Sequence, residues 1–134
     1  MDKHKYFAAM LIDDNEIDNI INTKMIESVN LAKFTYTHNS ASSAIDFLKN
    51  ILKLSTPEES KLPEYIFLDI DMPMMDGFQF LEEFSKLDER IKSHSKIIML
   101  TASVNPKDRE DASKYPNFVK YINKPLRQDD LSQL

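Results

Sequence analysis

The 134-residue sequence contains no cysteine and a single glycine. Without cysteine, the chain has no disulfide framework, no zinc–thiolate site and no thiol nucleophile, and this composition fits a reducing compartment. No glycine-rich or Ser/Thr-rich loop follows the first apolar segment, so nothing in the sequence suggests that a flavin phosphate binds there.

Positive charge and long apolar runs are also scarce. The 22 acidic residues outnumber the 17 lysines and arginines, and the net charge of −5 argues against a general nucleic-acid-binding protein. The apolar run at residues 7–12 is too short to cross a membrane, and no small-residue cleavage site follows it. We therefore expect an acidic, cytoplasmic protein without direct contacts to nucleic acid or membrane. Its length fits one domain, residues 1–134, without an output domain.

Five short segments have the composition of β-strands. Continuous apolar runs at residues 7–12, 65–68 and 97–100 suit strands that are covered on both faces of a parallel sheet. Residues 34–37 and 118–122 alternate between apolar and polar side chains, a pattern typical of less covered edge strands.

Helical patterns lie between the strands. Apolar residues with the spacing of one helix face form three sets: Ile17, Ile20, Ile21 and Met25; Ala41, Ala44, Ile45, Leu48 and Leu52; Phe80, Leu81, Phe84 and Leu87. A fourth helix is predicted to begin at Asn105-Pro106, with Asn105 as its cap. A fifth, short helix runs from about Gln128 to the chain end.

The alternation of five strands with five helices predicts a doubly wound α/β fold with a five-stranded parallel sheet. If the second and fifth strands form the edges, the strand order 2-1-3-4-5 follows, which is the flavodoxin-like arrangement. Residues 54–64 are predicted to form an exposed loop.

Three aspartates follow strands that this order places side by side. Asp13 and Asp14 end the first strand and Asp69 ends the third, and ligands of such sheets bind where the strand order reverses. Two carboxylates about 4 Å apart repel by about 4 kcal/mol at an effective dielectric constant of about 20. A cation can offset this repulsion, and oxygen ligands favour Mg²⁺ or Mn²⁺. Taken singly, each acid is equally compatible with a solvated loop residue or a helix cap.

Thr101 closes the fourth strand and Lys124 follows the fifth, at the same edge of the predicted sheet. A hydroxyl and an ammonium group there could hold the oxygens of a phosphoryl group. Together with the acidic residues they predict a phosphoryl-transfer site, in which a carboxylate oxygen of Asp69 is the nucleophile and an acyl phosphate forms.

Residues 67–77, FLDIDMPMMDG, closely resemble the phosphoacceptor segment of response-regulator receiver domains, of the chemotaxis-regulator type, in two-component signalling. The Asp13-Asp14, Thr101-Ala102 and Lys124-Pro125 pairs are similar to the other landmarks of that family and occur in the expected order. The resemblance covers almost the whole chain.

This resemblance implies a role for each acidic residue. Asp69 would accept a phosphoryl group from a histidine kinase or a histidine phosphotransfer protein in a magnesium-dependent reaction. Asp14 and Asp69 would bind the metal through their carboxylates, Asp13 through water and Asp71 through its backbone carbonyl. The protein would then be a regulator that assists only its own phosphorylation and dephosphorylation, rather than an enzyme.

The same resemblance implies that Thr101 and Lys124 hold the phosphoryl oxygens and that the Lys124–Pro125 bond is cis. Tyr121 would be a switching aromatic that turns inward when Thr101 moves toward the phosphoryl group. That movement would change the surface bound by a downstream protein of unknown identity.

Three further features of the phosphoacceptor segment lead to predictions. Gly77 is expected to provide backbone freedom for the turn after Pro73, and the adjacent methionines Met72, Met74 and Met75 are expected to be packing residues. The charge of Asp71 could position a hydrolytic water or repel the phosphoryl group, and so alter its lifetime.

Two other functions remain open. In a magnesium-dependent phosphohydrolase of the haloacid-dehalogenase type, Asp69 would attack the phosphate and Asp71 would act as the general acid. In a degenerate interaction module, the same fold would no longer accept phosphate. Steady turnover of a phosphomonoester would favour the hydrolase, whereas a single stoichiometric phosphorylation would favour the receiver.

Overall fold

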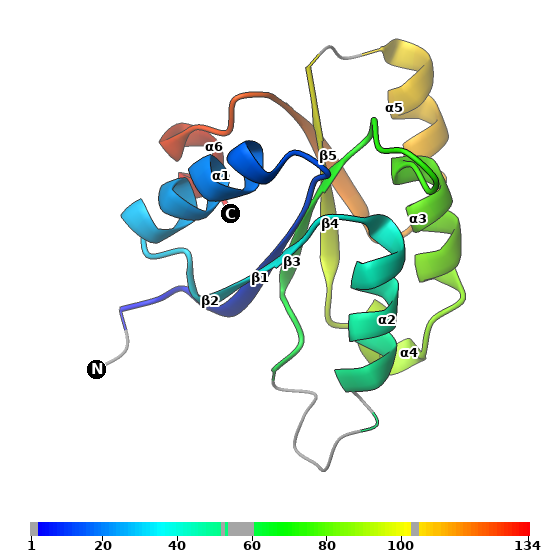
Figure 1. Ribbon diagram of the computed structural model, residues 1–134, viewed down its shortest axis with the longest axis horizontal. Helices are drawn as coiled ribbons and strands as arrows, with labels where there is room; N and C mark the ends of the chain where they lie inside the picture. Colours follow the sequence, from blue (N-terminus) through cyan, green and yellow to red (C-terminus); the bar gives the residue numbers. More distant parts are fainter. Residues whose placement is uncertain (1–2, 52, 54–60, 103–104) are drawn as a thin grey trace.

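The computed structural model describes residues 3–51, 53, 61–102 and 105–134. Strands and helices alternate along most of this chain (Figure 1), with the following bounds: β1 Tyr6–Ile12, α1 Glu16–Ser28, β2 Ala32–His38, α2 Ala41–Ile51, β3 Tyr65–Asp69, α3 Gly77–Ser85, α4 Glu89–Lys92, β4 Lys96–Thr101, α5 Pro106–Ala112, β5 Phe118–Asn123 and α6 Gln128–Ser132.

The strands form one parallel sheet in the order β2-β1-β3-β4-β5, which confirms the predicted topology. All residues of β3 are buried, because helices cover the centre of the sheet on both faces. The edge strands β2 and β5 are less covered than β3, as predicted, but their burial does not follow a strict alternation. Phe34 of β2 and Val119 of β5 are 46% and 45% exposed.

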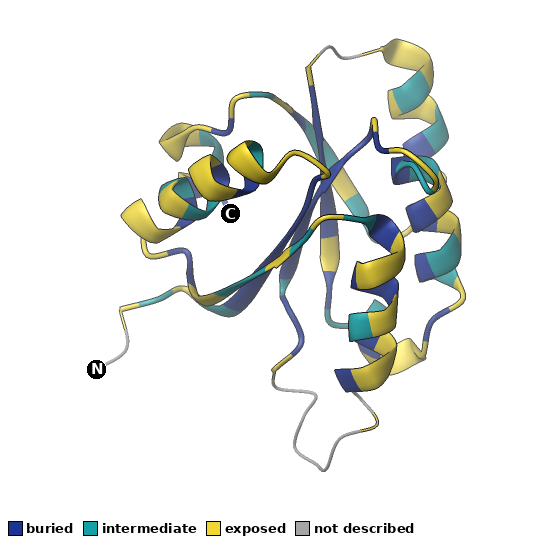
Figure 2. Cartoon of the chain, viewed as in Figure 1, coloured by how far each residue is buried: buried dark blue, intermediate teal, exposed yellow. Residues whose placement is uncertain are grey.

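Helices α1 and α6 cover one face of the sheet, and α2, α3, α4 and α5 lie on the other (Figure 1). Each face has its own apolar cluster. Ile26 of α1 and Leu131 of α6 pack with Phe67 on one side, and Phe80 of α3 packs with Ile66 on the other. The strands are therefore mostly buried, while the outer faces of the helices are exposed (Figure 2).

Six helices lie within the described residues, one more than predicted. The additional helix, α4, has four residues, which is too short for an apolar period to show in the sequence. The side chain of Asp88 caps it by accepting a hydrogen bond from the backbone nitrogen of Arg90 at 2.9 Å. Leu87 was assigned to the preceding helix, but α3 ends at Ser85 and Leu87 is buried just beyond it.

Helix α1 forms where predicted, but of its predicted apolar face only Met25 packs against the core. Ile17, Ile20 and Ile21 are 67%, 53% and 48% exposed, whereas Asn19, Asn22 and Ile26 are buried. The amide nitrogen of Asn19 donates hydrogen bonds to the backbone oxygens of Asp13 at 3.0 Å and His38 at 3.4 Å. These bonds hold the polar side of the helix against the strand ends and leave the isoleucines facing outward.

Helix α5 begins as predicted. The Asn105 side chain accepts a hydrogen bond from the backbone nitrogen of Lys107 at 2.9 Å, and Pro106 is the first helical residue. Of the predicted loop 54–64, residues 54–60 lie outside the described residues. The expectation of exposure is wrong for Leu62, which is fully buried in the apolar core. Among the described residues, no helix has the length and apolar character that crossing a membrane requires.

Candidate functional site

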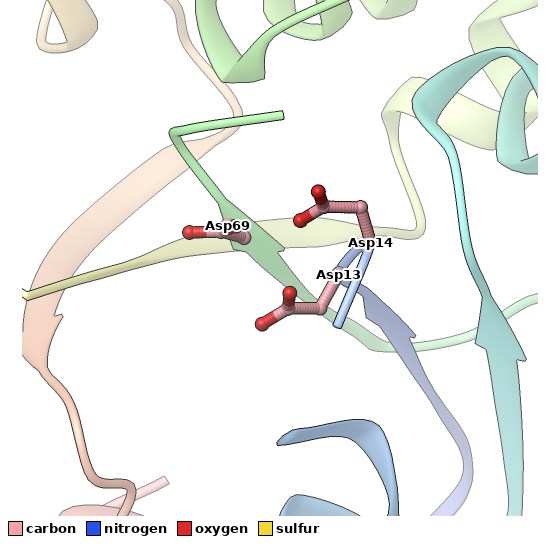
Figure 3. Close-up of side chains that lie close together, drawn as sticks. All are labelled: Asp13, Asp14 and Asp69. Atoms are coloured by element: carbon pink, nitrogen blue, oxygen red, sulfur yellow. The ribbon is translucent and has the colours of Figure 1, made fainter. Parts of the chain in front are cut away.

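The three predicted aspartates meet at the carboxyl ends of β1 and β3 (Figure 3). One carboxylate oxygen from each of Asp13, Asp14 and Asp69 lies within 4.8 Å of the others. Asp13 and Asp69 are only 2% and 6% exposed, whereas Asp14 is exposed. The site thus combines two buried acids with one that faces solvent.

The sheet register accounts for this meeting. Ile12 of β1 pairs with Leu68 of β3, so the residue that follows each of these positions lies at the same edge of the sheet. Asp13 is fixed further by its own carboxylate, which accepts a hydrogen bond from the backbone nitrogen of Asn15 at 2.9 Å. Asn15 then caps α1, so the acidic pair lies directly at the start of that helix.

Lys124 reaches the acidic residues from the segment that follows β5. Its Nζ atom lies 2.9 Å from Asp13 Oδ2 and 3.2 Å from Asp69 Oδ1. A third carboxylate, that of Asp18 in α1, lies 3.4 Å from the same nitrogen. The lysine therefore joins β1, β3 and α1 through one ammonium group.

Asp18 was not predicted as a site residue. It lies in the first turn of α1, where acidic residues are common because they interact favourably with the helix dipole. Its position in the sequence thus has an ordinary explanation. Only the three-dimensional position of Lys124, 106 residues further along the chain, shows the additional contact.

The backbone around Lys124 is tied to β4. The backbone nitrogen of Lys124 donates a hydrogen bond to the backbone oxygen of Thr101 at 2.8 Å. Thr101 is the last residue of β4, is 4% exposed and pairs with Asn123 of β5. The structure thus brings Thr101 and Lys124 to the same sheet edge as the acids. The Lys124–Pro125 bond is cis, as the resemblance implies.

The electrostatics of the site are unfavourable for a charged Asp69. Burial, and next the charge of Asp13, raise the pKa of Asp69 from 3.8 to about 6. Lys124 acts in the opposite direction, as does a backbone hydrogen bond from Asp71, but they do not offset the increase. The side chain of Asp71 itself is exposed.

Lys124 remains positively charged in these surroundings. Burial lowers its pKa, but the hydrogen bond to Asp13 and the charges of Asp69 and Asp13 outweigh that influence. The pKa of Lys124 therefore lies above its usual value of 10.5. A single ammonium group thus faces several carboxylates at neutral pH.

Gly77 lies against the backbone of Asp69 and Ile70. A Cβ atom at this position would lie 3.0 Å from Ile70 Cα, 3.2 Å from the backbone oxygen of Asp69 and 2.8 Å from the end of the Met99 side chain. No glycine has a positive φ angle, so the expectation of special backbone angles is wrong. Glycine is required by the close approach of α3 to the end of β3.

The three neighbouring methionines differ in their surroundings. Met72 is buried in the apolar core and Met75 packs against it, as predicted. Met74 is 98% exposed and has a φ angle of 71°, so the prediction of a packing role is wrong for this residue. Its position at the tip of the segment after Pro73 directs the side chain outward.

Tyr121, the predicted switch residue, lies on β5 and is partly buried against the apolar core. Its ring makes an edge-to-face contact with Phe118, with centroids 5.1 Å apart. The hydroxyl oxygen is buried without a hydrogen-bond partner. Burial first, and then the charges of Asp108 and Asp111, raise the pKa of Tyr121 to about 12.

The five-stranded parallel sheet in the order β2-β1-β3-β4-β5 defines a flavodoxin-like fold, and the acids and the lysine lie at the point where its strand order reverses. The family described as response regulator receiver domain matches residues 9–134. The chain belongs to this family, whose members act as signalling regulators in two-component systems.

Similar proteins agree with this assignment. A two-component response regulator from Cytophaga hutchinsonii is 26% identical, with a TM-score of 0.86 and coverage of 96% of this chain and 93% of the other. A response regulator receiver protein from Dyadobacter fermentans is also 26% identical, with a TM-score of 0.80 and coverage of 95% and 93%. The sensor histidine kinase CheAY of Helicobacter pylori is 27% identical over 126 residues. That match covers 94% of this chain but only 14% of the kinase.

Proposed function

We propose that this receiver domain is a phosphoacceptor switch in which Asp69 takes a phosphoryl group from a phosphohistidine. The observation that carries the proposal is the position of the Asp69 carboxylate. It is buried at the switch point, lies 3.2 Å from the Lys124 ammonium group and shares its surroundings with Asp13 and Asp14. Such an arrangement combines a nucleophile with groups that can neutralise a phosphoryl anion.

The donor atoms at this site fit a magnesium ion. Asp13, Asp14 and Asp69 offer carboxylate oxygens within 4.8 Å of one another, which Mg²⁺, or Mn²⁺ in its place, prefers. Burial and then the charge of Asp13 raise the pKa of Asp69, and Lys124 offsets only part of this increase. Asp14 and Asp69 would hold the ion through their carboxylates, Asp13 through water and Asp71 through its backbone carbonyl. Once bound, the ion would supply positive charge for the carboxylates and for the phosphoryl oxygens.

The chain's own residues perform the rest of the reaction. A carboxylate oxygen of Asp69 forms a bond to phosphorus, while the bond from phosphorus to the imidazole nitrogen of the donor breaks and that nitrogen keeps the electron pair. Lys124 remains beside Asp69 and attracts an oxygen of the transferred group. Thr101, at the end of the neighbouring strand, donates its hydroxyl hydrogen to a second oxygen. Hydrolysis of the acyl phosphate later restores the carboxylate.

Tyr121 provides the connection to a downstream partner in this proposal. Its hydroxyl is buried without a hydrogen-bond partner, so the ring position in the structure described here carries a desolvation penalty. A shift of Thr101 toward the phosphoryl group would change the balance between inward and outward positions of the ring. The surface formed by α5, β5 and α6 would then differ between the two states, and a downstream protein could distinguish them.

The phosphoryl donor would be a sensor histidine kinase or a histidine phosphotransfer protein, and the exchange would take place in the cytoplasm. The similarity to a segment of a sensor histidine kinase supports a partner of this kind.

The test is incubation with acetyl phosphate and Mg²⁺, followed by measurement of the intact mass. We expect one phosphoryl increment in the wild type and none after addition of EDTA or in Asp69→Ala. The matched control is Asp71→Asn, which should still gain the increment because the Asp71 side chain is exposed. Absence of the increment in the wild type would favour the interaction module. Continuous release of phosphate from a phosphomonoester would favour the hydrolase.

A further inference from the structure

Asp18 contributes a third carboxylate to the ammonium group of Lys124. We propose that Asp18 is a positioning residue for phosphoryl transfer, which holds Lys124 in place between Asp13 and the phosphoacceptor Asp69. This inference rests on the proposed function and adds a residue to its machinery. Asp18 acts through Lys124 and not by contact with the transferred group.

The number of donors on the lysine matches the number of acceptors. An ammonium group has three N–H donors, and three carboxylate oxygens lie 2.9, 3.2 and 3.4 Å from Lys124 Nζ. A lysine side chain has many rotamers. The two acids that flank Asp69, namely Asp13 and Asp18, therefore restrict the ammonium group to the position from which it reaches the phosphoacceptor.

The contacts that restrict the position of the Lys124 ammonium group become more important during phosphoryl transfer. The Asp69 oxygen that bonds to phosphorus ceases to be a free carboxylate oxygen, so the attraction between Lys124 and Asp69 changes while the phosphoryl group arrives. Asp13 and Asp18 take no part in this bond formation. Their contacts with Lys124 can then hold the ammonium group within reach of the phosphoryl oxygens at the moment when these need neutralisation.

Hydrogen bonds at the start of α1 hold the backbone of Asp18 in place. The side chain of Asn15, the helix cap, accepts hydrogen bonds from the backbone nitrogens of Ile17 at 2.9 Å and Asp18 at 3.2 Å. The next residue, Asn19, is bonded to the backbone oxygen of Asp13 at 3.0 Å. The backbone of Asp18 is thus connected to the same strand end that carries the buried acid of the site.

The effect of Asp18 on the stability of α1 can be separated from its effect on the position of Lys124. Glu16 is the other acidic residue in the first turn of α1 and is exposed. Replacement of Glu16 by Gln removes the same charge from the same helix end without removing an acceptor from Lys124. Glu16→Gln is therefore the matched control for Asp18→Asn.

The experiment measures the initial rate of phosphorylation by acetyl phosphate in Mg²⁺, from intact mass against time. We expect Asp18→Asn to be about two- to fivefold slower than the wild type, the range that a partly exposed ion pair supports. Glu16→Gln should not be slower, because loss of a negative charge alone reduces repulsion of the anionic donor. Asp18→Glu, which keeps the carboxylate, should recover at least half of the loss.

A double-mutant cycle separates positioning of Lys124 from any other effect of Asp18. In a Lys124→Met background, assayed at higher acetyl phosphate concentration, Asp18→Asn should cause no further decrease. Equal thermal unfolding midpoints for the single variants would establish that they are folded. Equal rates for Asp18→Asn and wild type, or an undiminished effect of Asp18→Asn without Lys124, would refute this inference and leave the proposed function intact. Failure of the wild type to react would overturn both.

Discussion

Asp69 lies where its negative charge destabilises the fold, so replacement of this residue by a neutral one should make the protein more stable. The pKa of Asp69 rises from 3.8 to about 6 in the folded chain, mainly because the group is buried and next because Asp13 is nearby. The difference between a pKa of 3.8 and one of about 6 corresponds to about 3 kcal/mol. Without a bound metal ion, Asp69→Asn should therefore raise the free energy of unfolding by up to about 3 kcal/mol at pH 7.5.

The stability gained by Asp69→Asn should increase with pH. A folded-state pKa above the unfolded-state value means that the folded chain binds the proton more tightly. The contribution of Asp69 is therefore most favourable below pH 3.8 and is lost as the pH rises through about 6. The advantage of Asp69→Asn should be fully developed above pH 7 and should vanish near pH 4.

Urea unfolding in EDTA, followed by far-ultraviolet circular dichroism at pH 7.5, 5 and 4, measures this difference. Asp71→Asn is the control, since that side chain is exposed and its replacement should change stability by less than about 0.5 kcal/mol. Addition of Mg²⁺ should stabilise the wild type more than Asp69→Asn, because ligand binding stabilises the folded state that binds it. A variant that is less stable than the wild type at pH 7.5 would show that the site is not electrostatically strained.

Four further predictions follow from individual contacts. Tyr121→Phe should raise the free energy of unfolding by about 1 kcal/mol in urea, because it removes a buried hydroxyl without a partner; a destabilised variant would contradict this. Gly77→Ala should lower the free energy of unfolding by about 1–3 kcal/mol, since the added methyl group meets the backbone of Asp69 and Ile70. Unchanged stability would show that α3 can shift to accommodate the methyl group. Ile26→Ala should lower the free energy of unfolding by about 2–5 kcal/mol, because Ile26 is fully buried, and Ile20→Ala should lower it by less than about 1 kcal/mol, because Ile20 is exposed. Equal losses for the two variants would contradict the assignment of the buried face of α1. Asp71→Asn should change the half-life of the phosphorylated protein, measured by intact mass after removal of the donor, and equal half-lives would dismiss a role for its charge.

The sheet could be predicted because hydrophobic patterns report directly on strand burial. The central strand β3 is continuously apolar up to its final aspartate and fully buried, whereas the edge strands carry polar residues among the apolar ones and are less covered, so the strand order followed from sequence. The meeting of Asp13 and Asp69 followed in turn, because parallel strands end at a common edge.

The helix faces were less predictable because hydropathy does not include hydrogen bonds. In α1, the amide of Asn19 bonds to two strand-end carbonyl oxygens and turns the isoleucines Ile17 and Ile20 outward. No count of apolar residues contains this information. The same holds for Gly77, whose role is a close approach between two segments rather than a backbone angle.

Asp18 is the residue of the site that the sequence could not predict. Its contact with Lys124 joins the start of α1 to the segment after β5, and such a contact depends on side-chain positions that no local pattern encodes. Asp13, Asp14, Asp69, Thr101 and Lys124 were found because each follows or ends a strand. Asp18 lies within a helix turn, where an acidic residue has an ordinary explanation.

Asp69 is proposed to form the acyl phosphate, and direct location of the modified residue tests this role. The protein would be phosphorylated with acetyl phosphate and Mg²⁺, reduced with borohydride, which converts an aspartyl phosphate to homoserine, and digested for peptide mass spectrometry. We predict homoserine at position 69 in the wild type, and none when Mg²⁺ is withheld. Homoserine at Asp13, Asp14 or Asp71 instead, or a phosphoryl group that resists borohydride, would contradict the account.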